Sequence, residues 1–325
     1  MLDRVVFEGH GPPAVMRVVH EDLLPSPGDD EVLVRVAYAG VNFLDLYQRS
    51  GAYTVRFPFT PGIEGSGVVV AAGAGVTGVA EGDRVAWAGA PGSYASHCLI
   101  PADRIIPVPA GVGLADAATV LIQGMTAHFL AADVVPLRAG DICLVHAAAG
   151  GVGGLLTQFA ALRGATVIGT VSSEAKVATA LAAGAEHVID YGREDFAERV
   201  REITGGRGVD VVYDAVGQET FERGLASLRP RGTFVLYGQT GGAVGAVDPQ
   251  ALNAKGSLFF TKASLSHYDR TRAAMLERAA EVFEHVMDGR LRLRVHGTYS
   301  LEQAVAAHEA LEARTVIGKV LLQPS

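Results

Sequence analysis

The sequence predicts an α/β protein that combines a doubly wound parallel sheet with a second, antiparallel barrel-like domain. Two rhythms carry this prediction: short strands bounded by Gly and Pro fill the first third, and strands alternate with helices from about Leu121. The chain has 325 residues, of which 49% are apolar and 19% charged, so it is long enough and apolar enough for two globular cores.

The first third contains β-branched or alternating runs that end at turn residues, which is typical of strands. We expect these strands at Val32 to Ala39, Gly67 to Ala72, Arg84 to Trp87 and Ser93 to Ile100. Short strands at such spacing predict an antiparallel, barrel-like arrangement.

The middle of the chain alternates between apolar strand-like runs and amphipathic helical segments. Strands are expected at Ile142 to His146, Thr166 to Thr170, His187 to Asp190, Val209 to Tyr213, Thr233 to Tyr237 and Ser257 to Phe260. Helices are expected at Gly151 to Leu162, Glu174 to Ala183, Glu194 to Ile203 and Glu219 to Leu228. This alternation predicts the doubly wound sheet.

The tail begins with a predicted helix from Ser264 through Met287, which ends because Gly289 occupies the C′ position. A strand near Leu291 to His296 and a helix from Leu301 to Ala313 follow. We expect the tail to return to the first domain, so that residues 1–122 and 265–325 form one domain and residues 123–264 the other.

Charge and cysteine usage narrow the function classes. The net charge is −8, the pI is near 5.7, and no basic run is present, which argues against nucleic acid as the main partner. Cys98 and Cys143 indicate neither a disulfide framework nor a metal cluster. Met1 to His10 lacks the apolar core of a signal peptide, and no apolar stretch looks long enough to span a bilayer. We therefore expect a cytoplasmic protein with no membrane partner.

A glycine-rich turn follows the first strand of the middle region. The spacing G-x-G-x-x-G places Ala148, Gly150 and Gly153 on its three positions, with Ala at the first. The second position allows backbone N–H groups to approach a pyrophosphate, the third allows close packing of helix on strand, and the helix N-terminus attracts negative charge. Within the strand–helix alternation, this turn predicts dinucleotide binding.

The end of the next strand favours NADPH over NADH. That strand ends in Thr170, without the acidic residue that holds the ribose 2′-hydroxyl of NAD. Ser172 and Ser173 supply small donors, and Lys176 supplies a cation for a 2′-phosphate. Alternatively, Ser173 only caps the next helix and Lys176 is only solvated. Glu174 counts against the NADPH interpretation.

Five segments carry a resemblance to a known family: Gly40 to Asp45, Arg49 to Tyr53, Pro61 to Gly65, His146 to Gly153 and Val211 to Gly217. The chain resembles, over nearly its whole length, the quinone oxidoreductase and zeta-crystallin branch of the zinc-free medium-chain dehydrogenase/reductases. The resemblance implies a GroES-like substrate domain, a Rossmann cofactor domain and a homodimer.

A catalytic metal is not expected. Zinc-dependent relatives place a Cys near Gly40 to Asp45 and a His before Glu64, and they carry a four-Cys lobe. This chain has Val41 and Ile63 at those places and no such lobe. A catalytic zinc needs three converging protein ligands, and these segments do not supply them.

The resemblance implies that the nicotinamide and substrate pocket is formed by Asn42, Tyr47 and Thr126, with Tyr53 at its mouth. Asn42 and Thr126 are expected to hydrogen-bond the carboxamide or the substrate oxygen, and Tyr47 to stabilise or protonate that oxygen. In a purely structural interpretation, Asn42 ends a strand, Tyr47 is a half-buried helix aromatic and Thr126 bonds back to its own helix.

Further cofactor contacts are implied by matched position beside the glycine-rich turn. They are Gly151, Val152, Ser172, Lys176, Tyr191, Tyr237, Gly238, Gln239 and Arg314. Tyr191 suits adenosine or its phosphate, and Arg314 suits a second cation from the tail. Gln239 departs from the Asn expected in close relatives.

Three functions remain open at this point. The leading one is NADPH-dependent reduction of a quinone. The second is reduction of a conjugated enone or enoyl thioester (an alkenal-type substrate) at carbon. The third, of another class, is an NADPH-binding structural or RNA-binding protein of the zeta-crystallin type. The predicted edge strand near Ser257 to Phe260 is a candidate for pairing between subunits.

Overall fold

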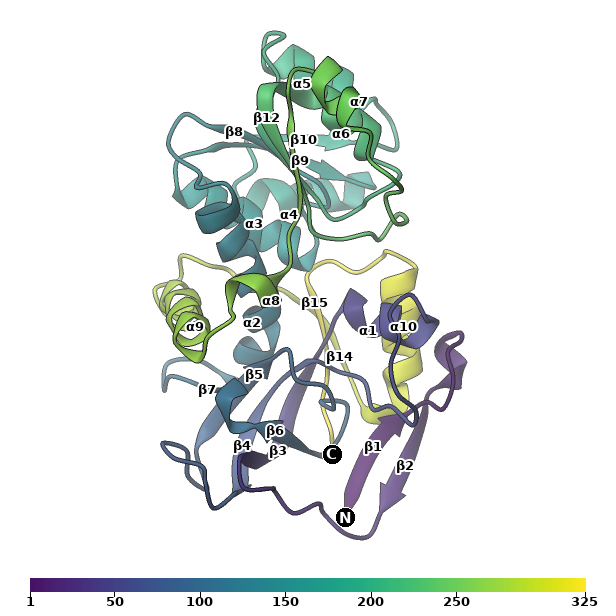
Figure 1. Cartoon of the computed structure of the whole chain (residues 1–325), viewed down its shortest axis with the longest axis vertical. Coiled ribbons are helices and arrows are strands. Elements are labelled where there is room, and N and C mark those ends of the chain that lie inside the picture. The colour runs from purple at the N-terminus through teal and green to yellow at the C-terminus, as the bar shows by residue number, and fades with distance from the viewer. The chain divides into compact units, whose positions relative to one another are not determined.

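A computed structural model describes all residues from Met1 to Ser325. The chain forms two compact units, which are described separately. Unit 1 contains Met1–Ile122 and Arg270–Ser325, and unit 2 contains Gln123–Asp269. Unit 2 is thus inserted between two segments of unit 1 (Figure 1).

Unit 2 is built on a six-stranded parallel sheet with the strand order β10-β9-β8-β11-β12-β13. Its strands are β8 (Ile142–Val145), β9 (Thr166–Val171), β10 (His187–Asp190), β11 (Val209–Asp214), β12 (Leu228–Leu236) and β13 (Phe259–Lys262). In chain order this is 3-2-1-4-5-6, the order of a Rossmann dinucleotide-binding sheet. The predicted doubly wound sheet is therefore confirmed.

The helices of unit 2 connect these strands. They are α3 (Gly151–Leu162), α4 (Val177–Ala182, after the 3-10 turn Glu174–Lys176), α5 (Phe196–Ile203), α6 (Phe221–Ser227), α7 (Pro249–Ala254) and α8 (Leu265–Tyr268). Apolar residues of the strands and of α5 and α6 form a core that includes Leu144, Ile168, Phe196 and Phe234.

Unit 1 contains a seven-stranded sheet with the order β14-β15-β3-β4-β5-β7, in which β6 also pairs with β3. The strands are β3 (Glu31–Val41), β4 (Glu64–Ala72), β5 (Arg84–Ala88), β6 (His97–Pro101), β7 (Ile105–Pro107), β14 (Val295–Tyr299) and β15 (Lys319–Leu322). A separate pair consists of β1 (Leu2–Val6) and β2 (Arg17–Glu21). All pairs are antiparallel except β14 with β15.

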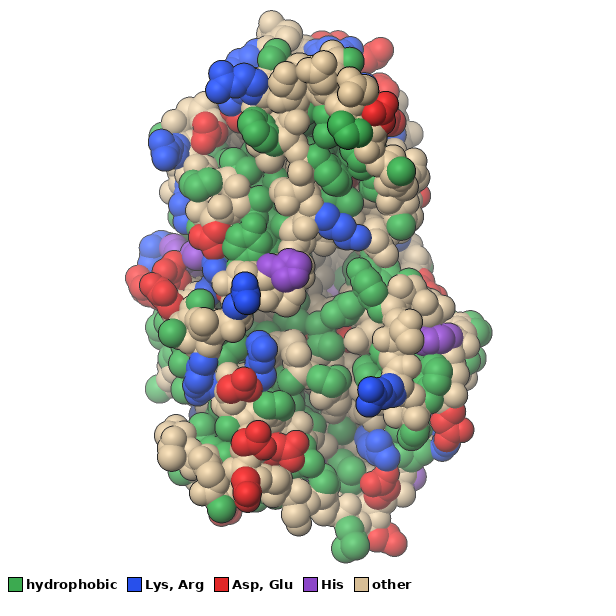
Figure 2. All heavy atoms as spheres, viewed as in Figure 1, with side chains coloured by type: hydrophobic (Ala, Val, Ile, Leu, Met, Phe, Trp, Pro, Cys, Tyr) green, Lys and Arg blue, Asp and Glu red, His purple; other side chains and the backbone are tan.

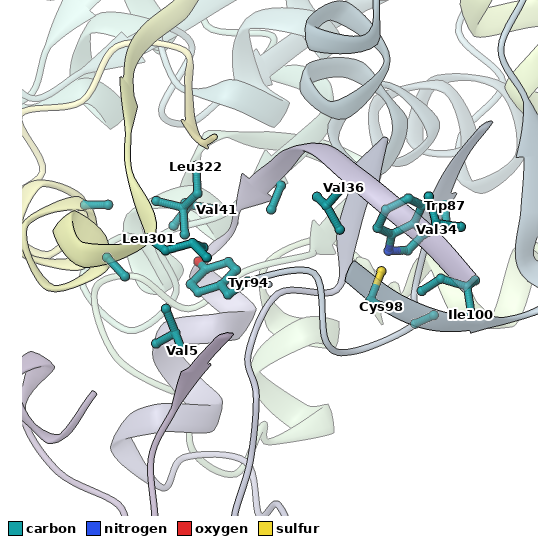
Figure 3. Close-up of a cluster of buried hydrophobic side chains, with 14 of the residues drawn as sticks. Val5, Val34, Val36, Val41, Trp87, Tyr94, Cys98, Ile100, Leu301 and Leu322 are labelled. Atoms are coloured by element: carbon teal, nitrogen blue, oxygen red, sulfur yellow. The ribbon is translucent and has the colours of Figure 1, made fainter. Parts of the chain in front are cut away.

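The helices of unit 1 are α1 (Phe43–Ser50), α9 (Arg272–Met287) and α10 (Ala304–Glu312), with 3-10 turns at Pro13–Val15, Ala102–Arg104 and Leu301–Gln303. Figure 3 shows the core of the unit, where side chains from β1, β3, β5, β6 and β15 meet. Trp87, the only tryptophan, is fully buried in this core and donates a hydrogen bond to Ser93.

One expectation about the tail needs correction. The helix predicted from Ser264 to Met287 is two helices, α8 and α9, because the chain leaves helical geometry at Asp269 and restarts with Thr271 as N-cap. The Thr271 hydroxyl accepts from the backbone N–H of Ala274. The expected stop is present: Gly289 has a φ of 67° directly after α9.

One helical segment bears on the expectation that no uninterrupted apolar stretch is long enough to span a bilayer. α2 (Leu114–Phe129) continues into a π-helical turn (Leu130–Val134), and this 21-residue helix has a mean hydropathy of 1.2. By length and composition it could cross a membrane. Its apolar window is 67% buried inside the structure.

Candidate functional site

The glycine-rich turn lies between β8 and α3 in unit 2. Gly150 is the N-cap of α3, and Gly154 donates its backbone N–H to the carbonyl of Gly150 at 2.8 Å. Ala148 is tied to β9, because its backbone N–H donates to Thr170 at 3.0 Å. The N-terminus of α3 therefore leaves backbone N–H groups and the positive end of the helix dipole at the carboxyl end of the sheet.

The third glycine of the motif is required by packing. A Cβ on Gly153 would collide with the carbonyl oxygen of Ala147 and come within 2.8 Å of its carbonyl carbon. A Cβ on Gly150 would lie 3.1 Å from the same oxygen. Gly151 and Val152 follow in the first turn of α3 and are half-buried. The turn has the close helix-to-strand packing that a dinucleotide site needs.

The end of β9 carries the residues expected to select NADPH. Lys176 Nζ donates to Ser172 Oγ at 3.1 Å, so the two side chains meet. Ser173 precedes the 3-10 turn at Glu174–Lys176 without a side-chain capping bond. Glu174, which counted against NADPH, pairs with Arg193 at 2.7 Å. Arg193 is an exposed cation in the loop after β10 and also lies 3.8 Å from Asp190; it was not among the residues predicted from the sequence.

The turn after β12 holds three more of the predicted contacts. Tyr237 and Gly238 both donate their backbone N–H to the carbonyl of Asp214, at 2.8 and 3.3 Å. A Cβ on Gly238 would lie 2.6 Å from the carbonyl oxygen of Ala215, so this position is closed to larger residues. Burial raises the pKa of the Tyr237 hydroxyl. Gln239 Oε1 accepts from Lys262 at 3.4 Å.

Two further predicted residues belong to unit 2. Tyr191 follows β10 and donates its backbone N–H to Val171 at 3.2 Å, which places it next to the end of β9. Thr126 lies in the second half of α2 and is half-buried. In this unit the structure brings the glycine-rich turn, the Ser172–Lys176 pair and Tyr191 to the carboxyl ends of neighbouring strands.

Unit 1 contains Asn42, Tyr47, Tyr53 and Arg314. Asn42 is the N-cap of α1, and Tyr47 lies on that helix with its ring centroid 5.7 Å from that of Tyr53. Tyr53 is 41% exposed and donates its backbone N–H to the carbonyl of Tyr47 at 3.0 Å. Arg314 lies in an exposed turn after α10 with a φ of 55°. The structure brings the three α1-region residues together.

Asn42 contacts a buried ion pair. Lys319 Nζ lies 2.5 Å from Glu64 Oε2 and 2.8 Å from Asn42 Oδ1, and both charged side chains are completely buried. The other Glu64 oxygen accepts the backbone N–H of Ile122 at 2.7 Å. Lys319 was not among the site residues predicted from the sequence. The available signal was a single charge within the apolar run Val316 to Leu322.

A second polar chain starts at the same helix. Asp45 Oδ2 accepts the backbone N–H of Asn42 at 2.8 Å and the Tyr94 hydroxyl at 3.1 Å. Because that hydroxyl has one hydrogen, its oxygen accepts from His308 Nε2 at 3.1 Å. Burial raises the pKa of Asp45 to about 7. Burial, with a smaller effect of Arg49, lowers the pKa of His308 to about 3.

Metal ligands do not converge anywhere in the structure: no group of three or more His, Cys, Asp or Glu side chains could hold an ion. Cys98 and Cys143 are free thiols. Both are buried, and burial raises the pKa of each, that of Cys143 to about 12. Neither thiol is activated as a nucleophile or ligand at neutral pH.

Two family models match two separate parts of the chain, which correspond approximately to the two units. The family model for the alcohol dehydrogenase GroES-like domain matches residues 28–110, and the model described as zinc-binding dehydrogenase matches residues 151–283. The first match lies within unit 1, and the second covers most of unit 2 and reaches into α9.

Individual relatives align over almost the whole chain. A 2-haloacrylate reductase from a Burkholderia species is 42% identical over 92% of both chains. Quinone oxidoreductase 1 of Escherichia coli strain K12 is 40% identical over 100% of both. The crystal structure of Escherichia coli quinone oxidoreductase complexed with NADPH superposes with a TM-score of 0.97, at 40% identity, over 99% of this chain and 100% of that one.

Proposed function

Because the chain belongs to the zinc-free medium-chain dehydrogenase/reductases of the quinone oxidoreductase family, we propose that it is an NADPH-dependent quinone reductase. Unit 2 would bind the cofactor and unit 1 the substrate. The description of the second family model refers to zinc, but no cluster of metal ligands is present, so the proposed reaction uses no metal.

The observation that carries the proposal is the group of polar side chains at the carboxyl end of β9. An NADPH 2′-phosphate would be held by Ser172 and Lys176, whose side chains already meet at 3.1 Å. Arg193 adds a third polar group and pairs with Glu174, the acid that would otherwise favour NADH. The pyrophosphate would lie at the N-terminus of α3, where a side chain at position 150 or 153 would crowd the carbonyl oxygen of Ala147.

Further contacts complete the proposed cofactor site. Tyr191, Tyr237 and Gln239 lie in the loops that follow β10 and β12 and would contact the adenosine and ribose part. Arg314 of unit 1 would add a cation to the phosphates. When bound, NADPH supplies the hydride. Thr126 and Asn42 would orient the nicotinamide, and Tyr47 would donate a proton to the reduced oxygen of the substrate, with Tyr53 beside it.

The first test follows nicotinamide absorbance with NADPH and then NADH against simple quinones, small enones and enoyl thioesters, with and without chelator. We expect oxidation by quinones that is selective for NADPH and insensitive to chelator. Turnover with enones or enoyl thioesters alone would reject the quinone assignment and retain the cofactor site. Tight NADPH binding without any turnover would instead indicate the structural or RNA-binding class.

The enone alternative has specific support, because the 2-haloacrylate reductase is named for an activated alkene. A substrate of that type needs the same donor for its carbonyl oxygen but accepts hydride at carbon. RNA binding has less support: the net charge is −8, and acidic and basic side chains are interspersed on the face shown in Figure 2.

We also propose a homodimer that forms through β13. This strand is at the end of the unit 2 sheet, so one of its sides has no strand partner there, and Phe259 on it is 60% exposed. Pairing of two β13 strands would be isologous. The backbone N–H of Ala263 donates to Leu236 of β12 at 2.9 Å, so the N–H of the preceding Lys262 faces the free side of β13. Lys262→Pro should then convert a dimer to a monomer in sedimentation experiments, whereas Thr179→Pro on α4 would test for general disruption. A Lys262→Pro protein that remains dimeric would reject this edge.

The compartment proposed is the cytoplasm. The two cysteines are unpaired, buried and of raised pKa, which suits a reducing environment. Fractionation of cells that express the tagged full chain would check this: recovery in the membrane pellet would contradict it.

A further inference from the structure

We propose that Lys319 and Glu64 are positioning residues, which lock the Asn42 side chain so that it can accept one hydrogen bond from a ligand but donate none. The inference rests on the proposed function, because it assigns Asn42 to the N–H₂ group of the nicotinamide carboxamide. It also excludes Asn42 as a donor to the substrate oxygen. The proposed role extends to residues far from Asn42 in sequence.

Sheet register brings the three side chains together. Val320 pairs with Val41 across β15 and β3, so Lys319 is opposite Asn42. Gly65 pairs with Ala39 across β4 and β3, so Glu64 is opposite Gly40. Position 40 has no room for a side chain: a Cβ there would lie 2.5 Å from Glu64 Oε2 and 2.7 Å from Lys319 Cε. The two charges meet over Gly40 because it is glycine.

The orientation of the Asn42 amide follows from its neighbours. An ammonium group can only donate, so the atom 2.8 Å from Lys319 Nζ is the amide oxygen. Both hydrogens of Nδ2 are then used within unit 1, because Nδ2 lies 3.1 Å from the carbonyl oxygen of Gly40 and 3.1 Å from Glu64 Oε2. One lone pair of Oδ1 remains, because the backbone N–H of Asp45 donates to the backbone carbonyl of Asn42 at 3.0 Å and not to its side chain. Reversal of the amide would place N–H groups against the ammonium and the amide oxygen against the carboxylate.

This arrangement divides the ligand-binding roles. The oxygen that becomes negative on reduction of a quinone needs donors, and Asn42 has none to offer. The carboxamide of a nicotinamide carries N–H groups, which suit the remaining lone pair of Oδ1. Asn42 is 8% exposed, whereas the side chains of Lys319 and Glu64 are fully buried behind it. Lys319 and Glu64 therefore act only through Asn42.

The test uses two probes, NADPH and its reduced 3-acetylpyridine analogue, in which a methyl ketone replaces the carboxamide and removes the N–H groups. Dissociation constants are measured by fluorescence titration of the full chain. We expect the wild type to prefer NADPH by about three- to tenfold, the value of one hydrogen bond. Asn42→Ala should lower this ratio to about 1, and Lys319→Met should do the same because the amide is released.

Two further variants guard against general destabilisation. Glu64→Gln combined with Lys319→Met removes both charges without leaving one buried alone, and should also lower the ratio. Ser66→Ala removes a buried hydroxyl two residues further along β4, which donates to the carbonyl of Leu114 and not to Asn42. Ser66→Ala should keep the wild-type ratio even if it lowers stability.

The outcomes separate the two levels of the proposal. If Asn42→Ala lowers the ratio while the Lys319→Met and double variants keep it, the positioning role is rejected and the assignment of Asn42 to the carboxamide stands. If Asn42→Ala keeps the ratio, both the assignment and the positioning role are rejected. If the wild type binds neither probe, the proposed NADPH site itself is rejected.

Discussion

Unit 1 and unit 2 each bury a carboxylate, and they satisfy it in different ways. In unit 2, Asp214 accepts the backbone N–H groups of Val216 and Gly217 and the hydroxyl of Thr220, at 2.6, 2.9 and 2.6 Å. All three donors are neutral and lie two, three and six residues after Asp214 in the sequence. In unit 1, Glu64 depends on Asn42, Ile122 and Lys319, which are 22, 58 and 255 residues away. A local turn suffices for the first carboxylate, whereas the second needs the complete unit.

The largest effect is expected when the buried ion pair of unit 1, Lys319 with Glu64, is broken. Lys319→Met leaves Glu64 buried without its counter-charge, and we expect a loss of about 3–5 kcal/mol in the free energy of unfolding. Urea unfolding followed by the fluorescence of Trp87, the only tryptophan and part of the unit 1 core, measures this loss. The Glu64→Gln/Lys319→Met double variant should recover most of it. Equal losses for the single and double variants would contradict the ion-pair explanation.

A smaller effect is expected at the unit 2 carboxylate. Asp214→Asn keeps one oxygen for the backbone donors but weakens the contact with Thr220, so we expect a loss of about 1–3 kcal/mol. Hydrogen exchange of the peptide that contains Val216 to Thr220 should become faster, whereas the Trp87 transition should not move. A shift of the Trp87 transition would mean that the effect is not confined to unit 2.

The pH dependence of unit 1 separates Asp45 from His308. The pKa of Asp45 is raised to about 7. Its contribution to the free energy of unfolding of unit 1 is therefore complete below pH ~4 and is lost as pH rises through about 7. The pKa of His308 is lowered to about 3. Its contribution to the same free energy is therefore complete above pH ~6.5 and is lost as pH falls through about 3.

The two slopes are opposite, at about 1.4 kcal/mol per pH unit each, and should nearly cancel between pH ~4 and ~6.5. In Asp45→Asn only the His308 slope remains, so unfolding of unit 1 should become harder as pH rises over this range. In His308→Gln, which keeps an N–H donor for Tyr94, unfolding should become easier as pH rises. Urea midpoints of the Trp87 signal at several pH values give both slopes. Parallel slopes in the two variants would refute the assignment.

The smallest effect concerns the exposed charges of unit 2. Lys176→Glu places an acid beside Ser172, and we expect the ratio of kcat/KM for NADPH to that for NADH to fall about tenfold or more. Arg201→Glu makes the same charge change on the exposed side of α5 and should leave the ratio near that of the wild type. A similar fall in both variants would indicate a general charge effect.

The same contrast, between local contacts in unit 2 and long-range contacts in unit 1, explains which features the sequence could predict. Gly151–Leu162 and His187–Asp190 match their expected bounds, because periodicity, glycine turns and caps are local signals. The Ser172–Lys176 pair was also within reach, since the two residues are four apart. Unit 1 was harder to predict. β1, β2 and β15 are short strands whose pairing depends on distant segments, so their sequences alone did not identify them.

The residues of the Asn42 cluster show the limit most clearly. Asn42 and Glu64 lie in segments that the family resemblance identified, but the partner that orients them is a lysine from the last strand. A lone lysine in an apolar strand indicates a buried partner and does not say which one. The break between α8 and α9 was missed for a related reason, because Thr271 also suits the polar face of a continuous helix.

The position of β15 in the chain has a consequence for biosynthesis. A ribosome completes all of unit 2 before it adds Lys319, so unit 2 has every residue that it needs while Glu64 still lacks its cation. The nascent first third must therefore remain incompletely folded, with β3 exposed along the side that β15 later covers, throughout the synthesis of some two hundred intervening residues. Chaperone demand during translation should accordingly concentrate on the segment that was made first.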